Sequence, residues 1–199
     1  MDFEQILLED GRRRQVIRAI VRDIITVYKK EDEGEFYLPN HIEKDDDYYN
    51  FTNFDHNLIV ELIIIENYDI EDFIVDANYW RDEEIIEIII DYNPDRKFET
   101  LYDLVGELNQ IVAHEIRHID QKHKGTHDLD QEEEYDPFKY YSQPHEVDAQ
   151  VFGFNRLSKL TKKPYEAVVR SWFEKNKDIH RLNEKEKEEI IKILLNYKN

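Results

Sequence analysis

The sequence predicts an α+β protein with an N-terminal helix, a small and mainly antiparallel sheet, one long helix and further C-terminal helices. Apolar residues recur at three- and four-residue spacing near the start, three runs rich in Ile and Val follow, and helical spacing returns after residue 100. The 199 residues, 40% of them hydrophobic, are enough to bury the core of one domain over 1–199, with 155–199 as a C-terminal helical portion.

The first predicted element is an amphipathic helix within residues 4–30. Its apolar positions repeat at helical spacing: Ile17, Ile20, Val21, Ile24, Ile25 and Tyr28. The basic stretch Gly11–Arg18 lies in this helix, so we interpret it as a solvated helix face and not as a nucleic-acid patch.

Strands are expected in the middle of the chain. A short strand is predicted at Phe36–Leu38, among residues rich in Gly, Pro, Asn and acids. Three longer runs of Ile and Val are separated by short polar turns: Leu58–Glu66, Asp72–Trp80 and Glu84–Tyr92. This spacing predicts that the three runs pair as consecutive antiparallel strands.

A long helix is predicted to follow the strands and to end where Gly125 offers a stop. Thr100 and Asp103 have the spacing of a capping box at its start. The apolar positions fill one arc of this helix: Leu101, Leu104, Val105, Leu108, Ile111, Val112, Ile116 and Ile119.

Two histidines and a glutamate stand near the end of this helix, in the sequence HEIRH. His114 and His118 fall on the flank of the apolar arc, whereas Glu115 falls inside it. Because an unpaired buried carboxylate is costly, Glu115 indicates a cation nearby. Histidines at i and i+4 can reach one tetrahedral ion, and the Glu between them is placed to take a proton from a water bound to zinc.

A catalytic zinc needs a third protein ligand. The metzincin pattern would place Gly and His where this chain has Gln121 and Lys124, which excludes it. The aspzincin pattern is matched only approximately, by Asp128 and Asp130.

A better candidate for the third ligand is Glu146, in a helix whose first turn contains Pro144. Small residues share the stripe of Glu146 along this helix, which would let the two helices approach closely. Asp148, and after it His145, stay open as alternative ligands or as groups that support the ligands.

The stretches HEIRHIDQ and YYSQPHEVDA are similar to sequences of the gluzincins, and in particular of the small zinc metallopeptidases of bacteria and bacteriophages with HExxHxxQ followed by YYxxPxExxA. The resemblance covers roughly Leu101–Phe154. It implies a zincin-like metallopeptidase domain with one catalytic Zn²⁺. The zinc ligands would be His114, His118 and Glu146. The general base would be Glu115.

The expected reaction is hydrolysis of peptide bonds in a peptide or protein substrate. The run Glu84–Asn93, directly before the long helix, is a candidate edge strand that pairs with an extended peptide. Tyr140 or Tyr141 could donate a hydrogen bond to the oxyanion, with core packing as the alternative for each. The acidic loop Asp128–Asp136 could cover a cleft and keep the enzyme latent.

Charge and composition exclude several functions. The chain has 46 acidic and 27 basic residues, and its net charge of -19 disfavours nucleic acid and membrane surfaces as partners. The absence of cysteine excludes disulfides and thiolate metal sites. We find no secretory signal and no apolar run of about 18 residues, so we expect a cytoplasmic protein.

The same acidic charge leaves a second function class open. An acidic interaction or regulatory protein, such as a nucleic-acid mimic or a pseudo-enzyme with a structural metal site, would also carry it. In such a protein the carboxylates, and not a metal, would carry the function.

Overall fold

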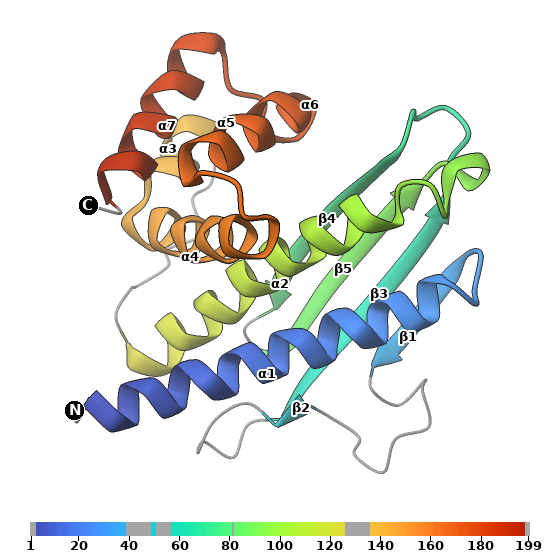
Figure 1. Cartoon of the computed structure of the whole chain (residues 1–199), viewed down its shortest axis with the longest axis horizontal. Coiled ribbons are helices and arrows are strands. Elements are labelled where there is room, and N and C mark those ends of the chain that lie inside the picture. Colours follow the sequence, from blue (N-terminus) through green and yellow to red (C-terminus); the bar gives the residue numbers. More distant parts are fainter. Residues whose placement is uncertain (1–2, 39–48, 51–56, 81, 126–135, 198–199) are drawn as a thin grey trace. The chain divides into compact units, whose positions relative to one another are not determined.

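The computed structural model describes residues 3–38, 49–50, 57–80, 82–125 and 136–197 (Figure 1). The positions predicted for an aspzincin-type ligand and for all but the last residue of the acidic loop, at 126–135, lie outside the described residues. The described elements confirm the α+β class: α1 Phe3–Tyr28, β1 Gly34–Leu38, β2 Tyr49–Asn50, β3 Asn57–Glu66, β4 Phe73–Trp80, β5 Ile85–Tyr92, the 3₁₀ turn η2 Pro94–Arg96, α2 Leu101–Lys124, α3 Pro137–Ser142, α4 Pro144–Thr161, α5 Tyr165–Lys175, α6 Lys177–His180 and α7 Glu184–Tyr197.

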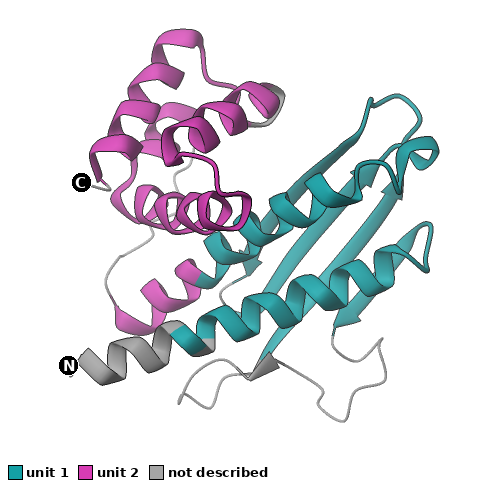
Figure 2. Cartoon of the chain, in the orientation of Figure 1, with its two compact units in different colours: residues 1–116 teal, residues 117–199 magenta. Residues whose placement is uncertain are grey.

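Two compact units divide the chain, Met1–Ile116 and Arg117–Asn199 (Figure 2). The division falls inside α2, so this helix begins in the first unit and ends in the second. The described elements of the second unit are all helical. A single domain over 1–199 stays a prediction. No helix among the described residues is long and apolar enough to cross a membrane.

The sheet of the first unit is mixed, and the predicted order of its strands is wrong. Its strand order is β1-β3-β5-β4, with β2 also paired to β3. The run Leu58–Glu66, in β3, pairs in parallel with β5, from Ile59↔Ile85 to Glu66↔Tyr92, and not with β4. The other described pairings, including β4 with β5, are antiparallel.

Composition gives a physical reason for this order. β3 and β5 are almost continuous runs of Ile, Leu and Val, which suit central positions, whereas Asp76 and Asn78 make β4 more polar and suit an edge. The connection from Glu66 to Phe73 must pass over β5. It must cover about 10 Å, because two strand spacings separate β3 from β4. Six intervening residues are enough for this, so the short turn does not specify a hairpin.

The corrected order changes which strand could pair with a peptide. β5 has a partner on each side, so the prediction that Glu84–Asn93 forms the edge strand is wrong. The edge strand next to β5 in the described sheet is β4. One face of β4 is exposed, and Trp80 on this face is 50% exposed.

The helix α1 contacts β1, β2 and β3 and runs across the sheet in Figure 1. Its predicted apolar face is buried, with Ile25 only partly so. Of the basic stretch, Arg14 and Arg18 are exposed, as a solvated face requires, whereas Arg13 is buried. The face of α1 that is buried in the first unit is therefore the one marked by the three-and-four spacing in the sequence.

The buried Lys97 fixes the segment that leads into α2. Its Nζ donates to the carbonyl oxygen of Glu31, at 2.7 Å, and pairs with Asp32 at 3.0 Å. The same ammonium lies about 5 Å from the ring centroids of Tyr28 and Tyr92, at 5.1 and 5.0 Å. This polar and aromatic cage ties the end of α1 to the last residue of β5 just before the long helix begins.

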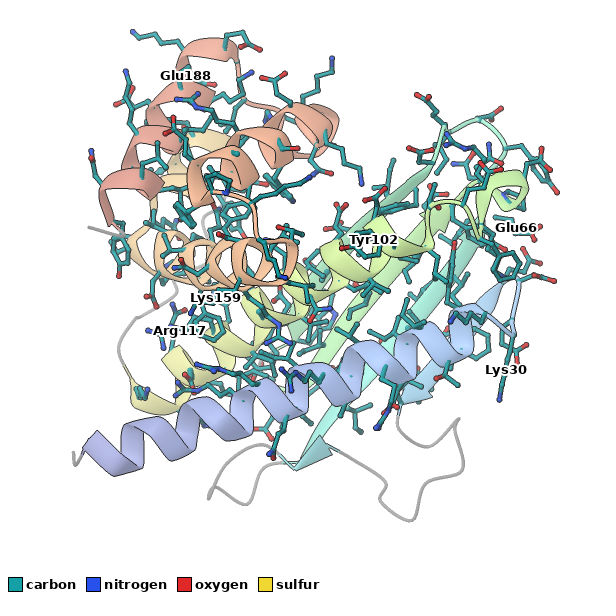
Figure 3. The ribbon with its side chains drawn as sticks, viewed as in Figure 1. Lys30, Glu66, Tyr102, Arg117, Lys159 and Glu188 are labelled. Atoms are coloured by element: carbon teal, nitrogen blue, oxygen red, sulfur yellow. The ribbon has the colours of Figure 1, made fainter. Side chains whose placement is uncertain are left out.

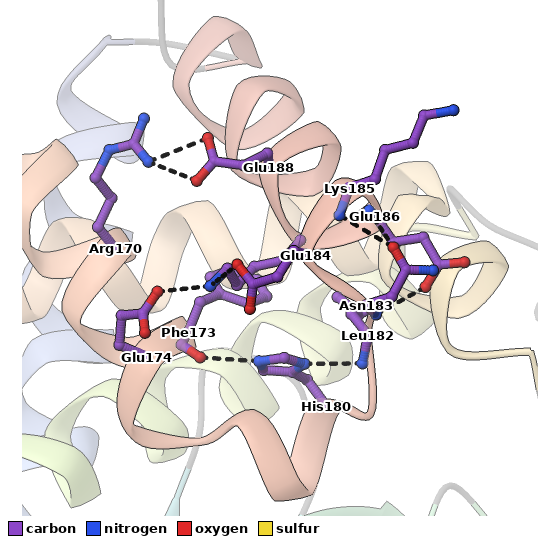
Figure 4. Close-up of polar contacts among 11 residues, drawn as sticks. Arg170, Phe173, Glu174, His180, Leu182, Asn183, Glu184, Lys185, Glu186 and Glu188 are labelled. Atoms are coloured by element: carbon purple, nitrogen blue, oxygen red, sulfur yellow. Dashed lines mark hydrogen bonds and ion pairs between the residues drawn. The ribbon is translucent and has the colours of Figure 1, made fainter.

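An apolar core holds the helices of the second unit together. It is formed by side chains from the described helices and the link before α7: Tyr141, Val147, Val151, Phe154, Tyr165, Val168, Val169, Phe173, Leu182, Ile190, Ile191 and Leu194. Polar contacts link the helices α5 and α7 around this core (Figure 4). His180 packs against Phe173 of this core, with Nε2 2.8 Å from the carbonyl oxygen of Phe173 and Nδ1 accepting the backbone N–H of Leu182.

The starts of α7 and α2 differ in how they are capped. Asn183 accepts two backbone N–H groups of α7, and Glu186 accepts the N–H of Asn183, which is a complete capping box (Figure 4). The capping box predicted for α2 is wrong. The Thr100 hydroxyl instead donates to the carbonyl oxygen of Arg96, and Asp103 is exposed.

Candidate metal centre

The predicted ligand pair lies on the last turns of α2. The apolar arc anchors this part of the helix, because Val112, Ala113 and Ile116 are fully buried. Glu115 is only 5% exposed, as its place inside the arc predicted, and its Oε1 lies 3.9 Å from Nε2 of His114. A carboxylate that would be solvated on most helices is thus held in the interior beside an imidazole.

The start of α4 supplies the second group of polar residues. Pro144 occupies the first helical turn, as predicted, after Gln143 in an extended conformation. His145 and Glu146 follow in the same turn and are both buried. The residues along the stripe of Glu146 are also buried: Ala149, Gln150 and Gly153.

These two helices bring together His114, His118 and Glu146, which could hold a metal ion. One ligand atom from each residue lies within 4.8 Å of the other two. Nε2 of His118 is 3.2 Å from Oε1 of Glu146. Two ligands of a tetrahedral zinc are separated by about 3.3 Å, given bonds of about 2.0–2.1 Å, so this pair already has a suitable spacing.

Comparison with protein-family models, curated proteins and solved structures found no match. Two imidazoles and one carboxylate are the protein ligands of one common type of catalytic zinc site. The residues present fit this ion.

Asp148, the first alternative ligand, is engaged elsewhere in the second unit. The guanidinium of Arg117 (labelled in Figure 3) donates to it from Nε at 2.6 Å and from Nη2 at 3.2 Å. Gln121 donates to the same carboxylate at 2.9 Å, and the Tyr197 hydroxyl does so at 3.4 Å. Asp148 does not belong to the group of three metal-binding residues.

The environment of Asp148 also shifts its acidity. Burial alone would raise the pKa of the Asp148 carboxyl. Hydrogen bonds from Arg117, Gln121 and Tyr197, together with the charge of Arg117, outweigh burial and hold this pKa below its usual value. The carboxylate is therefore ionised in the folded protein over the ordinary pH range.

We expect Asp148→Asn to lower the free energy of unfolding by about 2 kcal/mol near neutral pH, because it removes a charge-assisted pair. The native pKa lies below the unfolded value, so this contribution is present above about pH 4 and is lost as the pH falls through the native pKa. Urea unfolding at several pH values measures this. The difference between parent and variant should shrink in acid, and the exposed Asp103→Asn should show no such trend. A pH-independent difference would contradict the assignment.

His145, the second alternative, stays close to the group of three without belonging to it. Its Nε2 is 3.6 Å from Oε1 of Glu146, and its ring centroid is 6.0 Å from that of His118. This position suits a group that supports the ligands, or one that contacts a ligand of the metal.

The two tyrosines proposed for the oxyanion pack in the second unit. Tyr141 belongs to the apolar core, where its ring centroid lies 6.3 Å from that of Phe173. Tyr140 packs against this core, with its ring 5.2 Å from that of Tyr141. The packing alternative thus describes both residues, and an oxyanion contact stays a prediction.

Sequence reasoning missed the roles of Arg117 and Gln121. Both lie on the side of α2 that carries the ligand pair, three and seven residues after His114. Their spacing was the available signal. Their partners on α4 could not be deduced from it, because those contacts join residues 24 to 31 positions apart.

Proposed function

We propose that the protein is a zinc-dependent metallopeptidase of the zincin type, similar to the gluzincins. The observation that carries this proposal is the convergence of His114, His118 and Glu146, with the buried carboxylate of Glu115 next to the first of them. An open fourth ligand position is what distinguishes a catalytic zinc site from a structural one, and three protein ligands leave one.

The residues of this site have separate roles in the proposed hydrolysis of a peptide bond. His114, His118 and Glu146 would hold the zinc, which supplies a Lewis acid for the peptide carbonyl and lowers the pKa of water. Glu115 takes the proton of the attacking water on its carboxylate and then gives it to the nitrogen of the leaving amine.

The proposed substrate is a peptide or an extended protein segment. β4 is an edge strand of the described sheet, so one side of its backbone has no strand partner there. Such an edge can pair with an extended chain through backbone hydrogen bonds, with little dependence on its side chains. The strongly acidic chain favours basic or unstructured segments.

Elemental analysis of the purified protein tests the metal site. We expect close to one zinc per chain in the parent, and loss of this zinc in Glu146→Ala. Asp103→Asn serves as the control, because Asp103 is exposed and does not belong to the group of three. Zinc that is retained in Glu146→Ala and lost in Asp148→Asn would reassign the third ligand.

A parent protein that binds no zinc, even when zinc is offered, would contradict the peptidase. The acidic interaction or regulatory protein would then be the better description, since the net charge of -19 favours it independently of any metal.

A further inference from the structure

The side chain of Gln121 has a fixed orientation in the second unit. It is 3% exposed, and its Nε2 lies 2.9 Å from the carbonyl oxygen of His145 and 2.9 Å from Oδ2 of Asp148. Both partners are acceptors that carry no proton, so the amide nitrogen must face them. A flipped amide would place an oxygen against two other oxygens. The amide oxygen is therefore the atom that faces His118.

This orientation decides which nitrogen of His118 carries a proton. Oε1 of Gln121 lies 2.9 Å from Nδ1 of His118 and can only accept. Nδ1 therefore carries the hydrogen. In the neutral ring the lone pair is then on Nε2, which is the atom 3.2 Å from Glu146. A metal ligand needs a lone pair at that position.

We propose that Gln121 is a positioning residue that holds His118 in the tautomer and orientation of a metal ligand. Asp148 in turn holds Gln121, and the two hydrogen bonds from Arg117 hold Asp148. The contacts run from the guanidinium through the carboxylate and the amide to the imidazole. The parts of this inference that concern zinc and catalysis rest on the proposed function.

Each link in this chain has a partner that limits its freedom. Asp148 Oδ2 accepts from both Arg117 Nε and Gln121 Nε2, so it cannot turn toward another group without losing one of them. Gln121 has the carbonyl oxygen of His145 as a second acceptor, and this carbonyl belongs to the residue before Glu146. One amide thus links the orientation of His118 to the backbone that carries the carboxylate ligand.

A packing role for Gln121 makes a different prediction. Methionine has nearly the same length and volume as glutamine but offers no amide, so it would satisfy a requirement for packing alone. It could not hold a proton on Nδ1 of His118. The neutral imidazole in water favours the form with its proton on Nε2, so the positioning role predicts a change of tautomer in Gln121→Met.

The first test reads the tautomer in the metal-free protein. The nitrogen chemical shifts of the His118 ring, measured by NMR with ¹⁵N-labelled histidine, should show a protonated Nδ1 in the parent, whether or not Nε2 also holds a proton toward Glu146. In Gln121→Met the proton should move to Nε2. Gln15→Met, at an exposed position of α1, should leave the shifts of His118 unchanged. A parent in which Nδ1 carries no proton, or an Nδ1 that is protonated to the same extent in Gln121→Met, would overturn the proposal.

The second test measures zinc affinity by competition with a chelator. Loss of a hydrogen bond that orients a ligand lowers metal affinity by about 10- to 100-fold, and we expect this for Gln121→Met but not for Gln15→Met. Equal affinities in parent and Gln121→Met would contradict positioning. A parent that shows Nδ1–H but binds no zinc would contradict the proposed function and leave the assignment of Gln121 intact, so the two failures are distinguishable.

Discussion

Replacing Glu115 by Gln is expected to lower the rate of peptide hydrolysis by about 10²- to 10⁴-fold while the protein keeps its zinc. Glutamine preserves the size of the side chain but cannot accept a proton from the attacking water. Glu115 does not belong to the group of three metal-binding residues, so its replacement should leave the zinc content near one per chain. The expected result is thus a separation of metal binding from turnover.

The measurement pairs an assay of peptide cleavage with elemental analysis on the same preparation. Glu189→Gln, an equivalent change at an exposed position of α7, is the matched control and should retain full activity. Cleavage that persists at the parental rate in Glu115→Gln would remove Glu115 from the reaction. Activity of the chain as an acidic mimic, in contrast, would not depend on this single carboxylate.

Truncation of Phe173 to Ala should lower the free energy of unfolding of the second unit by about 3–5 kcal/mol. Phe173 is fully buried in the apolar core. Its ring lies 5.0 Å from that of Trp172 and 5.2 Å from that of His180, centroid to centroid. Removal of the ring loses these aromatic contacts and leaves a cavity that close-packed neighbours fill only in part.

Chemical denaturation followed by tryptophan fluorescence measures this effect, since Trp172 lies in contact with the changed residue. Phe98→Ala is a control with the same chemical change at a position that is 67% exposed, and it should shift the midpoint little. Similar losses in the two variants would show that Phe173 does not belong to a tightly packed core.

Periodicity in the sequence was sufficient to locate the main elements. The sequence predicted these elements with bounds that agree with the structure to within a few residues. The signals were the helical spacing in α1 and α2, the apolar runs of β3, β4 and β5, and the proline at the start of α4. The HEIRH spacing also predicted that His114 and His118 share one side of α2. These signals are local, because each depends on residues within one or two turns or one strand.

Long-range order could not be obtained in the same way. Nothing in the turn between β3 and β4 indicates that β5 lies between them, because six residues can form a hairpin or cross a strand. The same limit applied to Gln121, which the sequence marked as a departure from the metzincin pattern and as the last residue of the HExxHxxQ resemblance, without a structural role. Its significance depends on Asp148 and the carbonyl of His145, which only the tertiary structure brings to it.

The strand order also has a consequence for how the first unit folds. β3 and β4 are synthesised before β5. They are not neighbours in the sheet, and their shared neighbour is present only when β5 has been synthesised. A parallel pairing of β3 with β5 joins residues 26 apart along its whole length, which requires closure of a larger loop than a hairpin does. Until then the Ile- and Val-rich β3 and the more polar β4 each have an unpaired edge, and unpaired strand edges favour aggregation of incompletely folded chains. Formation of this sheet is therefore expected to be a late and slow event, set by the arrival of its last strand.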